Sequence, residues 1–121
     1  VGKRHTINPA EERMNRIKTY VICNATRQIS LDEISQHVGM NRSSFCSFFQ
    51  KMTGKTFVTF LNDYRIGLAC NLLEKRASNI SQICYACGFN DTPYFNRLFK
   101  RTTGLTPFEY ASAHGQKKAG L

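Results

Sequence analysis

The sequence contains an internal repeat, and this repeat limits the folds that the chain can adopt. One copy reads LDEISQHVGMNRSSFCSFFQKMTGKT and the other reads ISQICYACGFNDTPYFNRLFKRTTGLT. Gly39 matches Gly88, and each is followed by an apolar residue and an asparagine. Downstream, the second copy carries one extra residue, after which Thr53-Gly54 matches Thr103-Gly104. Two unrelated amphipathic helix pairs would not share both glycines and both Thr-Gly pairs, so we expect two copies of one structural unit.

Helix-capping patterns divide the chain into seven expected helices. Asn, Asp, Ser or Thr begins a helix by accepting free backbone N–H groups, and Glu or Gln three residues later completes a capping box. Glycines at 39, 54 and 88 are expected to end helices. No segment alternates as a strand does, so the fold class expected is all-α. The expected helix starts are Asn8, Ser30, Asn41, Thr56, Asn79, Asn90 or Asp91, and Thr106.

The expected organisation is two helix-turn-helix subdomains joined by a long linker helix, a homeodomain-like arrangement. We expect a flexible arm at residues 1–10, the first subdomain at 11–55, the linker helix at 56–76, the second subdomain at 77–112 and a flexible tail at 113–121. A helix of about 21 residues spans roughly 30 Å. One turn of B-DNA is about 34 Å. The linker helix could therefore hold two helices against successive major-groove faces.

The charge of the chain favours a polyanionic partner. Lys and Arg number 17 against 8 Asp and Glu, which gives a net charge of +9. Nucleic acid is the first expectation and an anionic membrane the second. The sequence contains no signal peptide and no apolar run of membrane-spanning length, which disfavours a membrane. Five cysteines, an odd number set among apolar neighbours, indicate reduced thiols and a cytoplasmic location.

Each repeat unit has the sequence pattern of a DNA-binding helix-turn-helix. A short capped helix, a turn that contains glycine and a second helix form a helix-turn-helix. The second helix must bury one face and leave a polar face for the major groove. In the second copy Phe95, Leu98 and Phe99 are expected to be buried. We therefore expect a protein that is not an enzyme and that binds double-stranded DNA sequence-specifically, with a sequence-indifferent architectural protein as the alternative.

Beyond the helix-turn-helix pattern, the sequence resembles the AraC/XylS family of transcription regulators over roughly residues 11–112. The resemblance implies the C-terminal DNA-binding domain of a longer, ligand-responsive regulator, with no cofactor. It implies RNA polymerase as a candidate partner and dimerisation, if any, through a region absent from this chain. The matching residues are Ile80-Ser81-x-Ile83, Gly88-Phe89-Asn90-Asp91, Tyr94-Phe95, Arg97-Leu98-Phe99-Lys100-Arg101, Thr103-Gly104, Thr106-Pro107 and Glu109-Tyr110. In the linker they are Phe60-Leu61-Asn62, Arg65-Ile66, Ala69 and Leu72-Leu73.

The resemblance also locates the residues expected to contact bases, in the first two turns of each second helix. Arg97 suits a bidentate contact to guanine and Asn96 one to adenine. The alternative for Arg97 is a pair with Asp91 or with a phosphate. In the first unit the expected reading face is small and weakly polar, which indicates shallow readout. The expected base-reading residues are Ser43, Ser44, Cys46 and Ser47 in the first unit, and Thr92, Pro93, Asn96 and Arg97 in the second.

Phosphate contacts are expected from basic side chains and from helix N-termini. Such residues bind DNA without reading its sequence, and any single one is as easily explained as solvated surface. The expected phosphate-binding residues are Arg42, Lys51, Lys55, Lys100, Arg101 and Thr106.

Two further features allow other interpretations. Cys84 and Cys87 form a CxxC motif, for which a thiol redox or metal-binding protein is the alternative function. A redox motif of this kind needs a neighbouring strand, and a zinc site needs two more ligands at suitable spacing, so buried core thiols are favoured and no metal site is expected. Arg65 lies on a partly apolar face of the linker helix, and we expect it to bridge the two units rather than to contact DNA.

Overall fold

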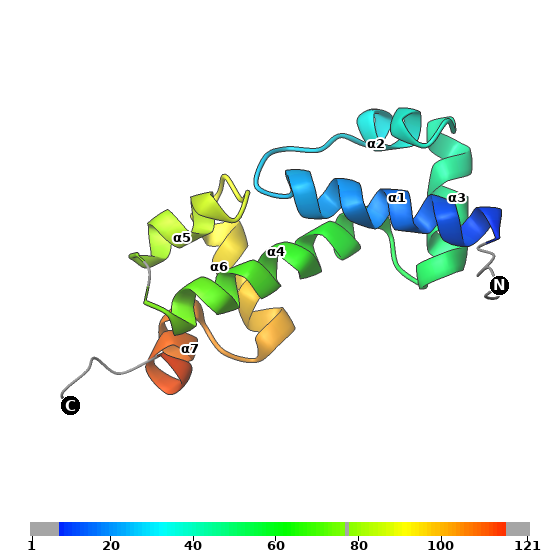
Figure 1. The fold of residues 1–121 in the computed structure, drawn as a ribbon. Helices are drawn as coiled ribbons and strands as arrows, with labels where there is room; N and C mark the ends of the chain where they lie inside the picture. The colour runs from blue at the N-terminus through cyan, green and yellow to red at the C-terminus, as the bar shows by residue number, and fades with distance from the viewer. Residues whose placement is uncertain (1–7, 77, 116–121) are drawn as a thin grey trace, which may run out of the picture. The chain divides into compact units, whose positions relative to one another are not determined.

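The chain folds into seven α-helices with no strand in the part that the structure describes, residues 8–76 and 78–115 (Figure 1). This computed structural model confirms the all-α fold class. None of the helices in the described part is long and apolar enough to cross a membrane. The helices are α1 (Pro9–Asn24), α2 (Leu31–His37), α3 (Arg42–Thr53), α4 (Phe57–Glu74), α5 (Ile80–Ala86), α6 (Thr92–Thr103) and α7 (Pro107–His114).

Four helix ends differ from the domain bounds expected from the sequence. The linker helix α4 is shorter than the expected range 56–76. Thr56 is the capping residue that precedes the helix, and the helix ends at Glu74. At the two ends of the chain, α1 begins inside the expected arm at Pro9, and α7 reaches His114, inside the expected tail. The remainder of the arm, residues 1–7, and of the tail, residues 116–121, lies outside the described residues.

The chain divides into two compact units. The first unit contains residues 8–24 and 29–59, which are α1, α2, α3 and the first turn of α4. The second unit contains the rest of α4 with α5, α6 and α7, and also the short segment of residues 25–28. The boundary along the chain therefore falls inside α4, after Thr59.

The capping residues are those that the sequence predicts. Ser30, Asn79 and Thr106 each form a complete capping box with the residue three positions later. Asn41 accepts the backbone N–H of the third residue of its helix, as Asp91 does in α6. Because Asp91 and not Asn90 is the cap, the extra residue of the second copy lies in the turn, and α3 and α6 have the same length of 12 residues.

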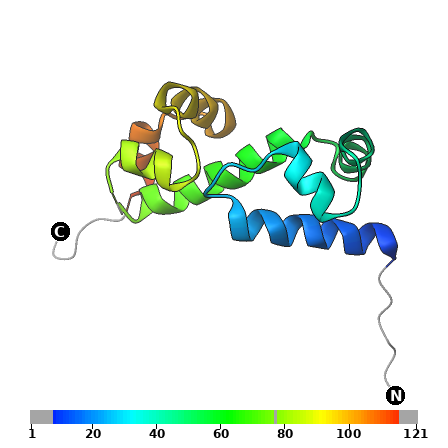
Figure 2. The same cartoon turned by 90° about the horizontal axis from the view of Figure 1, so that it is seen from above.

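The first unit is built around aromatic rings of α3. Phe45 and Phe49 are fully buried, and each ring centre lies 5.6 Å from that of Phe57, at the start of α4. The apolar stripe of α1 and the inner face of α2 cover these rings; Figure 2 shows α1 and α2 side by side and α3 almost end-on. The remaining buried apolar residues of this unit are Met14, Ile17, Val21, Ile34 and Val38.

The second unit repeats this core with helices α4, α5 and α6, and α7 closes it (Figure 1). Phe95 and Phe99 of α6 take the places of Phe45 and Phe49, with ring centres 5.7 Å apart as in the first unit. Tyr110 of α7 packs edge-on against Phe99. The other buried residues of this core are Ile66, Ala69, Leu73, Ile83, Cys84, Cys87, Phe89 and Leu98.

The CxxC motif belongs to this core. Cys84 and Cys87 are 0% and 1% exposed, which confirms the buried thiols expected from the sequence. Burial raises the pKa of both thiols, and that of Cys87 rises to about 11. A thiol with such a pKa is a poor nucleophile near neutral pH, because its thiolate form is scarce.

The two copies also end in the same way. Thr53 donates to the carbonyl oxygen of Phe49 at 2.9 Å and its Oγ1 accepts the backbone N–H of Lys55 at 3.1 Å. Thr103 makes the matching bonds to Phe99 at 2.9 Å and Leu105 at 3.2 Å. Gly54 and Gly104 follow with φ of +77° and +87°. Since Thr56 and Thr106 then cap the next helix, the first turn of α4 is the counterpart of α7.

Arg65 has the structural role expected from the sequence, but its hydrogen bonds lie within the second unit and do not bridge the two units as expected. Its side chain is 5% exposed and donates hydrogen bonds to the carbonyl oxygens of Ala25, at 2.7 Å, and Arg27, at 2.6 Å. Both carbonyls belong to the segment 25–28, which packs with this unit. Two charge-assisted hydrogen bonds satisfy a buried guanidinium that would otherwise be costly to remove from water.

Candidate nucleic-acid interface

The outward face of α6 carries the strongest set of candidate DNA-binding residues. Pro93, Asn96, Arg97 and Lys100 are exposed and follow the spacing i, i+3, i+4, i+7, which places them on one side of a helix. The opposite side holds Phe95, Leu98 and Phe99 in the core. The buried face therefore fixes which side chains α6 presents to a partner.

The outward face of α3 has the same geometry and a different chemistry. Each residue of α6 follows its counterpart in α3 by 50 positions, as Gly104 follows Gly54. The counterparts of the α6 face are Ser43, Cys46, Ser47 and Gln50, all of them exposed. These four side chains carry no charge, whereas Arg97 and Lys100 give the α6 face two positive charges.

The structure brings together the base-reading residues expected in each unit. Ser43, Ser44, Cys46 and Ser47 are exposed on α3, and Pro93, Asn96 and Arg97 are exposed on α6. Thr92 differs, because it is half-buried in the first turn of α6. Within the described residues Arg97 forms no ion pair with Asp91, so this alternative does not occupy its guanidinium.

Tyr85 is a surface residue of this region that the sequence analysis did not single out. It lies on α5, its side chain is 55% exposed, and its hydroxyl is 3.4 Å from Oγ1 of Thr92. Its counterpart in the first unit is Gln36, which is also exposed. A sequence signal existed: Tyr85 lies between the inward positions Cys84 and Cys87, on the outward side of α5.

The basic residues expected to bind phosphates are exposed, and some of the expected sites also interact with other residues of the protein. Lys51, Lys100 and Arg101 lie in the last turns of α3 and α6. Lys55 is exposed in the connection that follows α3. Arg42 pairs with Asp32 at 3.2 Å, although both side chains remain more than half exposed.

Thr106 also has a partner inside the protein. Its hydroxyl oxygen accepts the backbone N–H of Glu109 at 3.1 Å, and the Glu109 carboxylate accepts the backbone N–H of Thr106 at 2.9 Å. The bond from the Thr106 backbone lowers the pKa of Glu109. The N-terminus of α7 is therefore already capped by a carboxylate of the protein itself.

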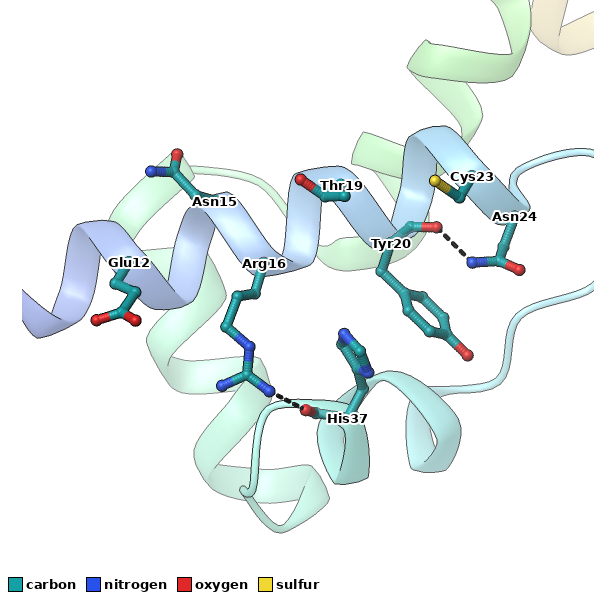
Figure 3. Close-up of a pocket in the computed structure, with 8 residues that line it drawn as sticks. All are labelled: Glu12, Asn15, Arg16, Thr19, Tyr20, Cys23, Asn24 and His37. Atoms are coloured by element: carbon teal, nitrogen blue, oxygen red, sulfur yellow. Dashed lines mark hydrogen bonds between the residues drawn. The ribbon is translucent and has the colours of Figure 1, made fainter.

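A groove of about 350 Å³ lies elsewhere, on α1 and the end of α2 in the first unit (Figure 3). Tyr20 and His37 both line it, and their rings pack against one another with centres 4.3 Å apart. Arg16 donates from Nη2 to the backbone oxygen of His37 at 2.7 Å. The groove shares no residue with the outward face of α3.

The described residues contain no group of His, Cys, Asp and Glu that could hold a metal ion.

Comparisons with known proteins agree with this architecture. The model of the family described as "Helix-turn-helix domain" matches residues 34–113. An uncharacterized HTH-type transcriptional regulator of Bacillus subtilis, YdeC, is 32% identical over 98 residues, which are 81% of this chain and 34% of that protein. The chain thus spans about a third of the length of this curated relative.

Solved structures share the fold. A transcriptional regulator of Chromobacterium violaceum with an AraC-type DNA-binding domain superimposes with a TM-score of 0.81 at 24% identity, over 90% of this chain and 97% of that one. The DNA-binding domain of AdpA, a global transcriptional factor solved in complex with a target DNA, superimposes with a TM-score of 0.78 at 22% identity, over 88% of this chain and 93% of that one.

Proposed function

The chain belongs to the AraC/XylS family of helix-turn-helix transcription regulators, and from this we propose that it binds double-stranded DNA at a specific sequence, which it reads with α3 and α6. The observation that carries the proposal is the outward face of α6. Asn96 and Arg97 are adjacent and exposed in a helix whose other side is buried. These are the side chain types that make bidentate contacts to adenine and to guanine in the major groove.

The two helices have unequal parts in this proposal. α6 carries the discriminating contacts, because Arg97 and Asn96 can each distinguish one base pair from the other three. α3 presents Ser43, Cys46 and Ser47, which suit methyl contacts, water bridges and recognition of DNA shape. The first unit then positions the chain on the duplex and adds a smaller part of the specificity.

Phosphate binding completes the proposed interface. Exposed basic side chains lie near the ends of both helices that are proposed to read DNA. In the first unit they are Lys51 and Lys55, and in the second unit Lys100 and Arg101. Tyr85 adds a hydroxyl beside the first turn of α6.

We expect Lys100→Ala to weaken binding to all sequences alike and to reduce the salt dependence of binding by about one counterion, since this residue contacts phosphate and reads no base. Titration of a selected site and of bulk DNA over a range of salt concentrations measures both effects.

The experiment that tests the function is the selection of binding sites from random double-stranded DNA. A preferred site should emerge, and at fixed salt it should compete against bulk DNA with an affinity at least about a thousandfold higher. Equal affinity for the selected and the bulk DNA would contradict the proposal and favour an architectural protein instead.

For the whole protein we propose a ligand-responsive transcription regulator of the bacterial cytoplasm, of which this chain is the DNA-binding part. Dimerisation, where it occurs, would involve a region outside this chain, and RNA polymerase is the candidate protein partner. Co-purification of the full-length protein with RNA polymerase on a promoter fragment that contains the selected site would test this partner. Recovery of no more RNA polymerase with the protein than without it would contradict the proposal.

A further inference from the structure

The turn between α5 and α6 contains a glycine that other residues enclose. Gly88 is buried and has a φ of +101°. A Cβ at this position would lie 2.3 Å from the carbonyl oxygen of Ala25 and 2.7 Å from Nε of Arg65. Both distances are too short for a real Cβ, so only glycine fits between these two groups without displacing one of them.

Arg65 and the segment 25–28 hold this turn from outside. Arg65 donates from Nε to the carbonyl oxygen of Ala25 and from Nη2 to that of Arg27, at 2.7 and 2.6 Å. Gln28 donates from Nε2 to the carbonyl oxygen of Gly88 at 3.0 Å. The segment is therefore bonded on one side to α4 and on the other to the turn. We call Arg65, residues 25–28 and Gly88 the turn clamp.

The turn clamp continues into α6 through two aromatic residues. The guanidinium carbon of Arg65 lies 5.9 Å from the ring centre of Phe89, which lies 5.1 Å from that of Phe95 on α6. Asn62, which lies on α4 and is 8% exposed, donates to the hydroxyl of Tyr94 at 2.9 Å. The start of α6 is thus held in place by contacts with α4 and with the turn clamp.

The matching turn of the first unit has no such enclosure. Gly39 is exposed, with a φ of +71°, and apart from its two chain neighbours no atom of the described residues lies within 4 Å of a Cβ built on it. This glycine is therefore not enclosed, although Arg16 of α1 donates to the carbonyl oxygen of His37 just before the turn. The enclosure of the turn is specific to the unit whose helix carries Asn96 and Arg97.

We propose that Arg65 is a positioning residue for DNA recognition by the second unit. It fixes the turn before α6 and thereby the orientation in which Asn96 and Arg97 meet the base pairs. Arg65 is buried and does not itself contact DNA. The inference rests on the proposed function, since it concerns how well one helix discriminates between bases.

The test compares variants of the turn clamp with matched variants elsewhere. Arg65→Lys keeps the charge and loses the forked donor geometry that holds two carbonyls. Its control is Arg13→Lys, because Arg13 lies over the ring of Phe48 in the first unit, 5.5 Å from its centre. Gly88→Ala adds the colliding Cβ. Its control is Gly39→Ala, which also places an alanine at a positive φ, of +71°, and causes no collision.

The measurement is the ratio of affinities for the selected site and for single base-pair changes of it. Arg97→Ala and Asn96→Ala first identify the base pairs that α6 reads, each at the base pair that the replaced side chain contacts. We expect Arg65→Lys and Gly88→Ala to lower the preference at those base pairs by about tenfold, within the range of a lost bidentate contact. Preference at the other base pairs is expected to remain, and Arg13→Lys and Gly39→Ala are expected to keep the wild-type ratios throughout.

A merely structural role would give a different result. If Arg65→Lys lowered the affinity for every site by one common factor, the positioning role would be overturned. If it left all ratios unchanged, the inference would also fail, although the proposed function would stand. If the wild-type chain itself preferred no sequence, the proposed function would fail. Where circular dichroism shows that Arg65→Lys has lost its helices, Gln28→Ala decides by the same ratios, because it removes only the bond to Gly88.

Discussion

The two units share a scaffold and differ in what the scaffold presents. Phe45 and Phe49 have counterparts in Phe95 and Phe99, and the hydrogen bonds of Thr53 recur at Thr103. On the outward faces, by contrast, Ser47 stands where the second unit has Arg97. The buried positions that build the unit and the exposed positions proposed to read DNA are therefore separate sets, and one set can change while the other is retained.

The largest expected effect concerns the shared scaffold. Phe49→Ala and Phe99→Ala each remove a fully buried ring from the same place in its unit. Each is expected to lower the free energy of unfolding by about 3–5 kcal/mol. Urea denaturation followed by circular dichroism measures the loss for the unit that carries the substitution. A loss in one variant that is less than half of the loss in the other would show that the two cores are not equivalent.

The next effect concerns the reading faces, where the units are expected to differ. Arg97→Ala should cost about 1–3 kcal/mol of discrimination at one base pair, because it removes a bidentate contact to guanine. Ser47→Ala at the matching position should cost less than about 1 kcal/mol, since a serine makes at most a single neutral hydrogen bond there. Parallel site selection with the two variants measures both losses. Equal losses would remove the proposed difference between α3 and α6.

Local interactions explain why much of this fold could be predicted from the sequence. A capping residue and its partner are three positions apart, so Ser30, Asn79 and Thr106 could be assigned without knowledge of the tertiary structure. The buried and exposed faces of α6 follow from helical periodicity alone. The choice between Asn90 and Asp91 could not be made in this way, because either side chain can cap a helix.

Contacts between distant parts of the sequence account for what was missed. Arg65 binds the carbonyl of Ala25, which is 40 positions away, and backbone carbonyls leave no signal in a sequence. The pair of Arg42 with Asp32 depends on how α2 and α3 cross. The same holds for Tyr85, whose place beside Thr92 depends on the angle between α5 and α6. The expected site residues could thus be assigned to a face, but their partners could not.

The smallest expected effect is a pH dependence at the start of α7, where the matching turn of the first unit has no carboxylate. In the helix α7 the carboxylate of Glu109 accepts the backbone N–H of Thr106, and this bond lowers the pKa of Glu109, as does the nearby charge of Lys100. At the matching position, in the first turn of α4, stands Thr59, which does not titrate. Because the pKa is lower in the folded chain, the stabilisation is complete above the ordinary pKa of 4.5 and is lost as the pH falls through the lowered value.

Glu109→Gln should therefore lower the melting temperature slightly at pH 7, and this difference from the wild type should shrink as the pH falls below 4.5 through the lowered pKa. Thermal unfolding of the two proteins between pH 3 and 7 measures this difference, and Thr59→Val serves as the control because its effect should not vary with pH. A difference between Glu109→Gln and the wild type that grows as the pH falls would contradict the assigned role of this carboxylate. The difference between the two units would then lie only in the reading faces and in the turn before α6.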